Sequence, residues 1–353
     1  MRITLVSSCG LVLEQDGSAL LIDALNKQFR CYYGLPPEVF AKMLAGEPPY
    51  DAVCGVLFTH AHPDHYSASR AEQLRAAAVI FGEPSEAQLA QTENLRLLQL
   101  TWAGADKYTR IENLPQSVVL ANASGAFGTI IAEYAIGSLV ALYRSFGRYW
   151  SNKQAHIWQK YDHAETISGK TALVLGMGDI GANVARRLKV FGAAVLGVKR
   201  TAVSAVSADF DEAHTLDALD ALLPRADIVI GCLPNTRETA GLLTAERLHA
   251  MKAGAVLVNV GRGSLAGTDD LVSALQDGHL GGAALDVFET EPLPADCPLW
   301  DMENVLLTPH IAGPSFGGSA DVQNTIWHIC MDNLERYLTG NPLKNVVNRS
   351  EGY

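Results

Sequence analysis

Two short runs in this 353-residue chain carry side chains that could do chemistry, and they suggest different kinds. Residues 60–65 read His-Ala-His-Pro-Asp-His, which brings together imidazoles and a carboxylate, the ligand types that suit zinc, iron or manganese. Residues 176–181 read Gly-Met-Gly-Asp-Ile-Gly, the glycine spacing of a loop that receives a dinucleotide. The surrounding elements decide which run belongs to a complete site.

The glycine run lies where a strand is expected to pass into a helix. An apolar strand is predicted over 171–175, and a helix is predicted to run from the loop to Phe191. Gly176 would allow a tight turn, Gly178 would let a pyrophosphate approach the backbone, and Gly181 would let helix and strand pack closely. The helix N-terminus would then offer free N–H groups and partial positive charge to the phosphates.

The end of the next predicted strand bears on the choice between NAD and NADP. An NAD site usually has Asp or Glu there to bind the ribose 2′-hydroxyl. This chain has Lys199, Arg200 and Thr201 instead, and no acid follows until Asp209. A guanidinium suits a 2′-phosphate, so the sequence favours NADP over NAD. The alternative is that Lys199 and Arg200 are a solvated surface pair.

From residue 67 onward the sequence alternates predicted strands with predicted helices, which indicates an α/β protein with a mostly parallel sheet. The apolar segment 128–149 is expected to form one helix, and a last helix is expected over about 319–339. The strands are predicted at 78–82, 96–101, 117–121, 171–176, 194–198, 227–231, 255–260, 282–285 and 304–308.

The first 77 residues follow a different pattern. Asp16-Gly17 lies between two apolar runs, which is a strong hairpin signal. A buried strand is expected over 52–59, with short helices over 36–45 and 66–76. Whether the hairpin joins the same sheet as the following strands is left open by the sequence.

Composition narrows the class of protein. The length suggests two domains, and 48% hydrophobic with 18% charged residues is ordinary for a globular enzyme. A net charge of −11 argues against a nucleic-acid or anionic-membrane partner. No apolar run approaches the roughly 18 residues of a membrane helix, and the N-terminus fits a strand better than a signal peptide. Six scattered cysteines are expected to be reduced, which indicates a cytoplasmic protein.

Five further motifs follow the glycine loop, in segments 233–239, 251–256, 259–264, 284–294 and 308–313. With the loop, they make residues 78–353 resemble the D-isomer-specific 2-hydroxyacid dehydrogenase family. The resemblance implies a Rossmann-type doubly wound parallel sheet in a dinucleotide-binding domain, 127–314. It also implies a smaller flavodoxin-like substrate domain, 1–126 and 315–353, here with an atypical N-terminal hairpin. Hinges near 124–127 and 312–317 would close the cleft between the domains.

The resemblance also implies a mechanism, the transfer of a hydride between NAD(P)H and a small 2-oxo or 2-hydroxy acid. His310 matches the general acid and base, a task that imidazole suits near neutral pH. Glu291 matches the carboxylate that orients it, and Arg262 matches the arginine that binds the substrate carboxylate and polarises the carbonyl. The backbone N–H groups expected to cradle the substrate carboxylate are those of Ala103, Gly104 and Ala105.

A homodimer is implied as well, with the 128–168 segment contributing to the interface. A non-catalytic NAD(P)-sensing regulator with the same fold is the alternative, although such a sensor need not keep the three residues Arg262, Glu291 and His310. The residues expected to contact the cofactor are Gly176, Gly178, Asp179, Ile180, Gly181, Lys199, Arg200, Thr201, Leu233, Pro234, Thr239, Val260, Gly261, Asp286, His310 and Gly313.

The histidine run has a resemblance of its own. With the hairpin and strand before it, segment 1–75 resembles the start of a metallo-β-lactamase fold, in which His60, His62, Asp64 and His65 would bind metal. The resemblance ends near residue 75, so the run could supply at most half of each metal site. A metal-dependent hydrolase is therefore an alternative function, and the sequence favours no catalytic metal.

Overall fold

The computed structural model describes residues 77–161, 164–201, 205–314 and 319–353, together with the backbone of four strands before residue 77. The chain divides into two compact units. The split unit comprises Met1–Ser124 and Gln323–Tyr353, and the central unit comprises Gly125–Val322. The predicted α/β class with parallel sheets is confirmed. Among the described residues, no helix combines the length and apolar character needed to cross a membrane.

The central unit is built on a seven-stranded sheet in which every neighbouring pair is parallel. The strand order is β10-β9-β8-β11-β12-β13-β14, so the chain runs outward from β8 and then returns to β11 to run the other way. That reversal is the switch point at which doubly wound sheets bind ligands. The strands are β8 (Thr171–Leu175), β9 (Ala194–Lys199), β10 (Glu212–Thr215), β11 (Ile228–Gly231), β12 (Ala255–Asn259), β13 (Leu280–Leu285) and β14 (Val305–Leu307).

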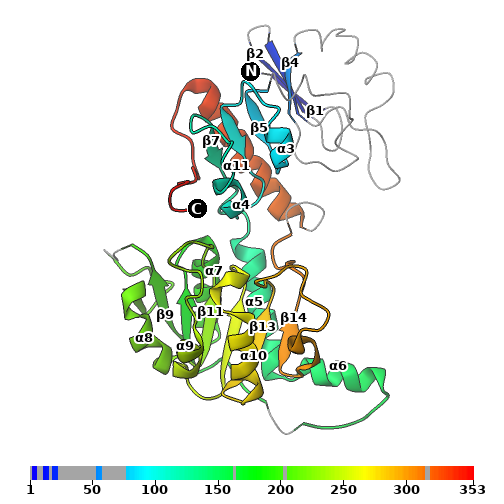
Figure 1. Ribbon diagram of the computed structural model, residues 1–353, viewed down its shortest axis with the longest axis vertical. Helices are drawn as coiled ribbons and strands as arrows, with labels where there is room; N and C mark the ends of the chain where they lie inside the picture. The colour runs from blue at the N-terminus through cyan, green and yellow to red at the C-terminus, as the bar shows by residue number, and fades with distance from the viewer. Residues whose placement is uncertain are drawn as a thin grey trace. The chain divides into compact units, whose positions relative to one another are not determined.

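Helices cover both faces of this sheet, which explains why its strands are continuous apolar runs rather than alternating ones (Figure 1). Leu173 and Leu175 belong to a core shared with the helices of one face, whereas a Cβ at Gly181 of α7 would meet Val174 from the other. The first face carries α8 (Leu219–Leu222), α9 (Ala245–Ala250) and α10 (Thr268–Gln276), and the second α5 (Gly128–Tyr143) and α7 (Asp179–Val190).

Two sequence expectations for the central unit are wrong. The single helix expected over 128–149 is two helices, α5 and α6 (Phe146–Gln154). Ser145 between them has a φ of 53°, a left-handed conformation that interrupts the helical hydrogen-bond ladder. Strand β10 was not expected, because its residues, Glu-Ala-His-Thr, form a half-exposed sheet edge without an apolar run.

The split unit contains a three-stranded parallel sheet of β5 (Val79–Phe81), β6 (Leu97–Gln99) and β7 (Val119–Ala121). Short helices α3 (Glu86–Leu89) and α4 (Asp106–Thr109) follow the first two strands, and most of α11 (Ala320–Thr339) returns from the end of the chain. Buried Asn333 of α11 donates to the Gln99 side chain at 2.6 Å. The Val347 N–H donates to the Leu120 carbonyl at 2.8 Å.

The four early strands form a sheet of their own in the order β1-β2-β3-β4. They are β1 (Arg2–Leu5), β2 (Leu11–Gln15), β3 (Ser18–Ile22) and β4 (Val53–Leu57). Strands β2 and β3 pair antiparallel with Gln15 opposite Ser18, which confirms the predicted hairpin. The hairpin therefore joins β4, in parallel with β3, and not the β5–β7 ladder. The helices expected over 36–45 and 66–76 lie outside the described residues.

Candidate active site

The carboxyl ends of the parallel strands bring the expected residues of the central unit to one edge of the seven-stranded sheet. The glycine loop follows β8, and segment 233–239 follows β11. Segment 260–262 follows β12, Asp286 follows β13, and segment 308–310 follows β14. In open α/β sheets this edge is where ligands bind.

The glycine loop has the geometry that a pyrophosphate requires. Gly176 has a φ of 105°, and a Cβ at Gly181 would lie 1.8 Å from the Gly176 carbonyl oxygen. A Cβ at Gly178 would meet no atom within 4 Å, so the space beside this backbone is open. Gly178 is also the N-cap of α7, with no side-chain cap. The first turn of α7, with Asp179 and Ile180, therefore fits a phosphate group.

The end of β9 carries cations, while the acids that follow it have other partners. Lys199 is half-buried, and Arg200 and Thr201 are exposed. Asp209 forms a bidentate pair with Arg186, at 3.0 and 3.1 Å. Asp211 accepts from the Val195 N–H and from Lys189, both at 2.8 Å, and these bonds lower the pKa of its carboxyl. Both acids therefore stabilise the protein itself.

Segment 233–239 forms a turn that is held by hydrogen bonds of its last residue, Thr239. The buried Thr239 hydroxyl donates to the Pro234 carbonyl at 2.5 Å and accepts from the Thr236 N–H at 2.8 Å. Leu233 lies under the neighbouring loop, since a Cβ at Gly261 would be 2.6 Å from its carbonyl oxygen. Leu233, Pro234 and Thr239 thus form a fixed turn beside Val260 and Gly261.

Asn259 shapes the turn that carries Arg262, and the sequence did not identify it. Its side-chain amide donates to the Arg262 carbonyl at 2.9 Å, and its oxygen accepts from the Gly261 N–H at 3.2 Å. Asn259 is 2% exposed at the end of an otherwise apolar strand. An asparagine at the end of an otherwise apolar strand is the sequence pattern that could have identified Asn259 as a residue that shapes the following turn. Arg262 itself is half-buried, and one guanidinium nitrogen donates to the Gly261 carbonyl at 2.9 Å.

His310 and Glu291 form the pair expected from the sequence motifs. The His310 Nδ1 lies 2.9 Å from Glu291 Oε2, and Glu291 Oε1 accepts from the Phe288 N–H at 3.0 Å. Because the carboxylate can only accept, the shared proton belongs on Nδ1, and Nε2 is left to exchange a proton with a ligand. His310 is about half exposed, and its φ of 56° is left-handed, a conformation that a histidine keeps only where its surroundings fix it.

Asp286 provides many of the hydrogen bonds that hold the backbone of His310 and its neighbours in this conformation. Its carboxylate is almost fully buried and accepts from the Thr308 hydroxyl at 2.6 Å, the Ile311 N–H at 2.8 Å and the Ala312 N–H at 2.9 Å. Its carbonyl accepts from the His310 N–H at 2.8 Å. The sequence motifs suggested Asp286 only as a cofactor contact. The structure shows that it also holds the loop of His310, while Gly313 packs closely on α5 beyond it.

The substrate loop expected in the split unit follows β6. The Ala123 N–H donates to the Trp102 carbonyl at 2.9 Å, and the Asn122 side chain donates to the Ala103 carbonyl at 2.8 Å. Ala103 and Gly104 are half-buried and Ala105 is buried. Within the described residues, the N–H groups of these three residues show no intramolecular acceptor. The loop therefore offers neutral donors of the kind that bind a carboxylate.

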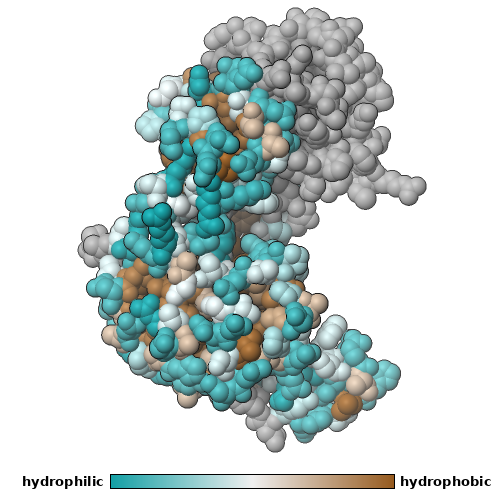
Figure 2. Space-filling model, viewed as in Figure 1, coloured by the Kyte–Doolittle hydropathy of each residue, from teal (hydrophilic) through white to brown (hydrophobic). Residues whose placement is uncertain are grey.

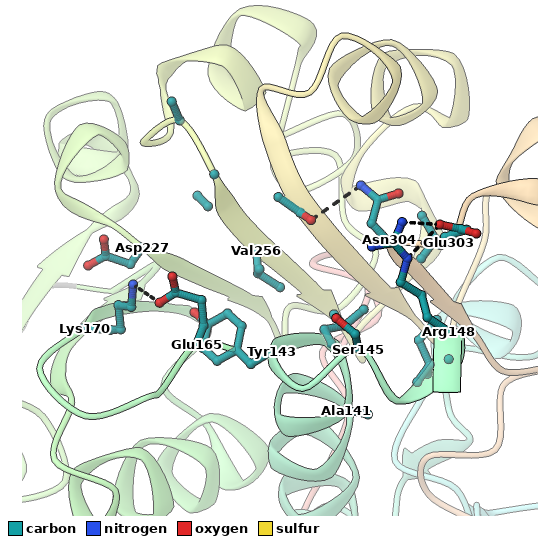
Figure 3. Close-up of a pocket in the computed structure, with 18 residues that line it drawn as sticks. Ala141, Tyr143, Ser145, Arg148, Glu165, Lys170, Asp227, Val256, Glu303 and Asn304 are labelled. Atoms are coloured by element: carbon teal, nitrogen blue, oxygen red, sulfur yellow. Dashed lines mark hydrogen bonds and ion pairs between the residues drawn. The ribbon is translucent and has the colours of Figure 1, made fainter. Parts of the chain in front are cut away.

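A cavity of about 620 Å³ lies at the opposite, amino-terminal edge of the seven-stranded sheet (Figure 3). Its charged side chains form ion pairs: Lys170 with Glu165 at 2.8 Å, Arg148 with Glu303 at 2.6 Å, and Asp227 with Lys252 outside the cavity at 2.9 Å. Burial raises the pKa of Tyr143, which also lines it, so this phenol stays protonated. The cavity contains none of the residues expected to act on a ligand.

The candidate metal ligands His60, His62, Asp64 and His65 lie outside the described residues. In the part of the chain that is described, no group of three or more His, Cys, Asp or Glu side chains is arranged to hold a metal ion.

Comparison with known proteins gives one consistent family. Residues 136–312 match the model described as D-isomer specific 2-hydroxyacid dehydrogenase, NAD binding domain. An uncharacterized protein of Corynebacterium melassecola is 32% identical over 290 residues, 80% of this chain and 92% of that protein. None of the comparisons supports the metallo-β-lactamase resemblance of segment 1–75.

Two similar solved structures contain a cofactor. A D-isomer specific 2-hydroxyacid dehydrogenase of Xanthobacter autotrophicus, in complex with NADPH and MES, is 30% identical with a TM-score of 0.72, covering 89% of this chain and 94% of that one. An NADPH-dependent glyoxylate/hydroxypyruvate reductase of Sinorhizobium meliloti, in complex with NADP and sulfate, is 29% identical with a TM-score of 0.73, covering 90% and 97%.

Proposed function

This chain belongs to the D-isomer specific 2-hydroxyacid dehydrogenase family, and from that premise we propose that it reduces a small 2-oxo acid with NADPH. It is an NAD(P)-dependent oxidoreductase of the 2-hydroxyacid dehydrogenase type. The relative from Sinorhizobium meliloti acts on glyoxylate and hydroxypyruvate, and these small acids are the substrates proposed for this chain.

The observation that carries the proposal is the pair of His310 and Glu291. It lies at the edge of the seven-stranded sheet where the carboxyl ends of the strands meet. When bound, a reduced nicotinamide supplies the hydride. His310 would donate its Nε2 proton to the carbonyl oxygen, giving the 2-hydroxy acid, and would accept that proton in the reverse direction. Glu291 orients the imidazole through its bond to Nδ1.

In the central unit, Arg262 would bind the carboxylate of the substrate. A guanidinium offers two parallel N–H donors to a carboxylate and can also polarise the adjacent carbonyl. Asn259 fixes the backbone on both sides of that arginine. In the split unit, the N–H groups of residues 103–105 are neutral donors that would receive a carboxylate.

The preference for NADP over NAD is proposed from the end of β9. Lys199 and Arg200 follow the strand where an NAD site would place an acid, and Asp209 and Asp211 are already bound to other groups of the protein. The similar structures named above hold NADPH and NADP. Kinetics with NADPH and NADH test this proposal in the parent protein and in Arg200→Ser. The variant should lose affinity for NADPH with little change for NADH, and a parent that prefers NADH would contradict the assignment.

The homodimer and the cytoplasmic location expected from the sequence stay predictions. The segment from α6 to residue 161 exposes several large apolar side chains, including Phe146, Trp150 and Trp158, the last of which is 99% exposed. Figure 2 shows this arm extending from the central unit, mostly hydrophilic with one small hydrophobic spot. Light scattering of the parent and of Trp158→Ser would show whether the arm contributes to self-association.

The function is tested by following NADPH oxidation across a panel of 2-oxo acids with the parent, His310→Asn and His249→Asn. His249 is a matched control, because it also pairs with a carboxylate, Asp277 at 2.8 Å, and is similarly exposed. We expect His310→Asn to lower kcat by about 10²–10⁴-fold with NADPH affinity retained, and His249→Asn to behave as the parent. A His310→Asn variant as active as the parent would refute the mechanism.

A further inference from the structure

Glu83 is a partly buried carboxylate that has no part in the reaction described above. It lies in the split unit between β5 and α3, 18 residues before the substrate loop. Its Oε1 accepts from the Thr101 N–H at 2.8 Å and from the Trp102 N–H at 3.2 Å. The Thr101 hydroxyl lies 2.9 Å from both carboxylate oxygens. One side chain therefore binds three donors of the same turn.

These bonds divide the loop into two functional parts. Glu83 accepts from the N–H groups of Thr101 and Trp102. From the β7 side, Ala123 donates to the Trp102 carbonyl and the Asn122 side chain donates to the Ala103 carbonyl. The three N–H groups that follow, at 103–105, are the ones proposed to receive the substrate carboxylate. The carbonyls of Trp102 and Ala103 share their peptide planes with the N–H groups of Ala103 and Gly104, so the direction of these two N–H groups is fixed.

We propose that Glu83 is a positioning residue for the substrate: its carboxylate orients the loop at 101–105 so that the following N–H groups converge on the carboxylate of a 2-oxo acid. The proposal deepens the function given above and rests on it. It assigns to Glu83 no contact with the reacting atoms.

The surroundings of Glu83 make this arrangement sensitive to pH. Burial raises its pKa to about 7, although the hydrogen bonds from Thr101 and Trp102 and the charge of Lys107 on α4 act in the opposite direction. The other titratable groups that sense it are Tyr108 on α4 and Cys330 on α11, and burial together with the Glu83 charge raises the pKa of both. Near neutrality Glu83 is thus the group of this cluster that changes charge.

Protonation would remove an acceptor that the loop uses. The ionised carboxylate can accept every bond described above, whereas the neutral acid must donate one proton. Hydrogen bonds to an ionised acceptor are also about twice as strong as those between neutral groups. The N–H groups of the loop should therefore be oriented less well for a carboxylate, and the substrate should bind less tightly, as the pH falls below about 7.

Charge alone predicts the opposite effect, because an ionised Glu83 would repel a substrate carboxylate. The two accounts give opposite signs. If orientation dominates, Glu83→Gln weakens substrate binding, and if repulsion dominates, the same variant strengthens it.

Steady-state kinetics of the full-length protein with NADPH and glyoxylate would test the proposal in the parent, Glu83→Gln and Glu86→Gln. Glu86 is a matched control, an exposed glutamate three residues away on α3. We expect Glu83→Gln to raise KM about tenfold with kcat within about threefold and NADPH affinity unchanged, and Glu86→Gln to match the parent. Between pH 8 and pH 6 the KM of the parent should rise, while that of Glu83→Gln should stay flat.

Thr101→Val is the second variant, because it removes the hydroxyl donor while keeping both amides, and it should raise KM about threefold. It decides the matter if Glu83→Gln does not fold. If Glu83→Gln folds, an unchanged or lowered KM overturns the positioning role and leaves the proposed function standing. If it does not fold, an unchanged or lowered KM in Thr101→Val has the same meaning. A parent that reduces no 2-oxo acid overturns the proposed function and this inference with it.

Discussion

Replacing Glu83 with glutamine should change how the stability of this protein depends on pH. Burial raises the pKa of Glu83 from its ordinary value of 4.5 to about 7. A folded state that holds the proton more tightly than the unfolded chain is most stable below the ordinary pKa. The stabilisation is then lost as the pH rises through the folded value, near 7. This direction is the opposite of that for a carboxylate in an ion pair.

The size of the effect follows from the shift. One pKa unit corresponds to about 1.4 kcal/mol, so the full effect is about 3 kcal/mol, of which about 2.5 kcal/mol falls between pH 5 and pH 8. Glutamine does not titrate and makes no such contribution. The free energy of unfolding of Glu83→Gln, measured relative to the parent, should therefore rise by about 2.5 kcal/mol over that range.

Urea unfolding at several pH values between 5 and 8 measures this difference in the parent, Glu83→Gln and the control Glu86→Gln. Because each variant is compared with the parent at the same pH, the titration of all other groups cancels. Far-UV circular dichroism should be recorded together with tryptophan fluorescence, since two units need not unfold in one transition. A difference that stays constant within about 0.5 kcal/mol, or that falls with pH, would refute the assigned environment of Glu83.

Three further changes test the carboxyl edge of the central unit. Gly181→Ala would force a Cβ against the Gly176 carbonyl oxygen, 1.8 Å away, so the free energy of unfolding should fall by about 2 kcal/mol in urea titrations. The Cβ of Gly178→Ala meets open space, so the stability of the protein should be unchanged. The Kd for NADPH, measured by fluorescence, should rise at least about tenfold. Equal NADPH affinity would argue against a pyrophosphate at this turn. Asp286→Asn weakens the acceptor of the His310 loop, so kcat should fall about tenfold and the amides of 308–312 should exchange faster with deuterium. Unchanged exchange in that segment would show that Asp286 does not hold the loop.

The sequence predicted those features that depend on local order and on topology. The glycine loop, the strand that precedes it and the helix that follows it are encoded within about 20 contiguous residues. Once the strands are parallel, the segments after them must share one edge, which places Arg262 and His310 on the same side of the sheet. The pairing of Glu291 with His310 was available from the family motifs and is present at 2.9 Å.

The sequence could not predict the groups that fix these residues, because their partners are distant in the chain or are backbone atoms. Glu83 lies 18 residues from Thr101, and Asp286 lies 22 residues from Thr308. Neither pair lies within a single helix or strand, so no periodic pattern in the sequence marks the contact. The turn at Ser145 was hidden for a related reason, since the apolar run through it reads as an uninterrupted helix.

Because the split unit is assembled from both ends of the chain, its folding during synthesis on the ribosome differs from that of the central unit. The central unit is continuous in the chain, whereas the split unit needs Asn333 against Gln99 and Val347 against Leu120. During synthesis the central unit can thus fold as soon as it emerges, while the first 124 residues wait for the last 31. The substrate loop therefore matures last, and a nascent chain lacking its C-terminal helix would carry a folded cofactor sheet before it could carry a complete substrate-binding unit.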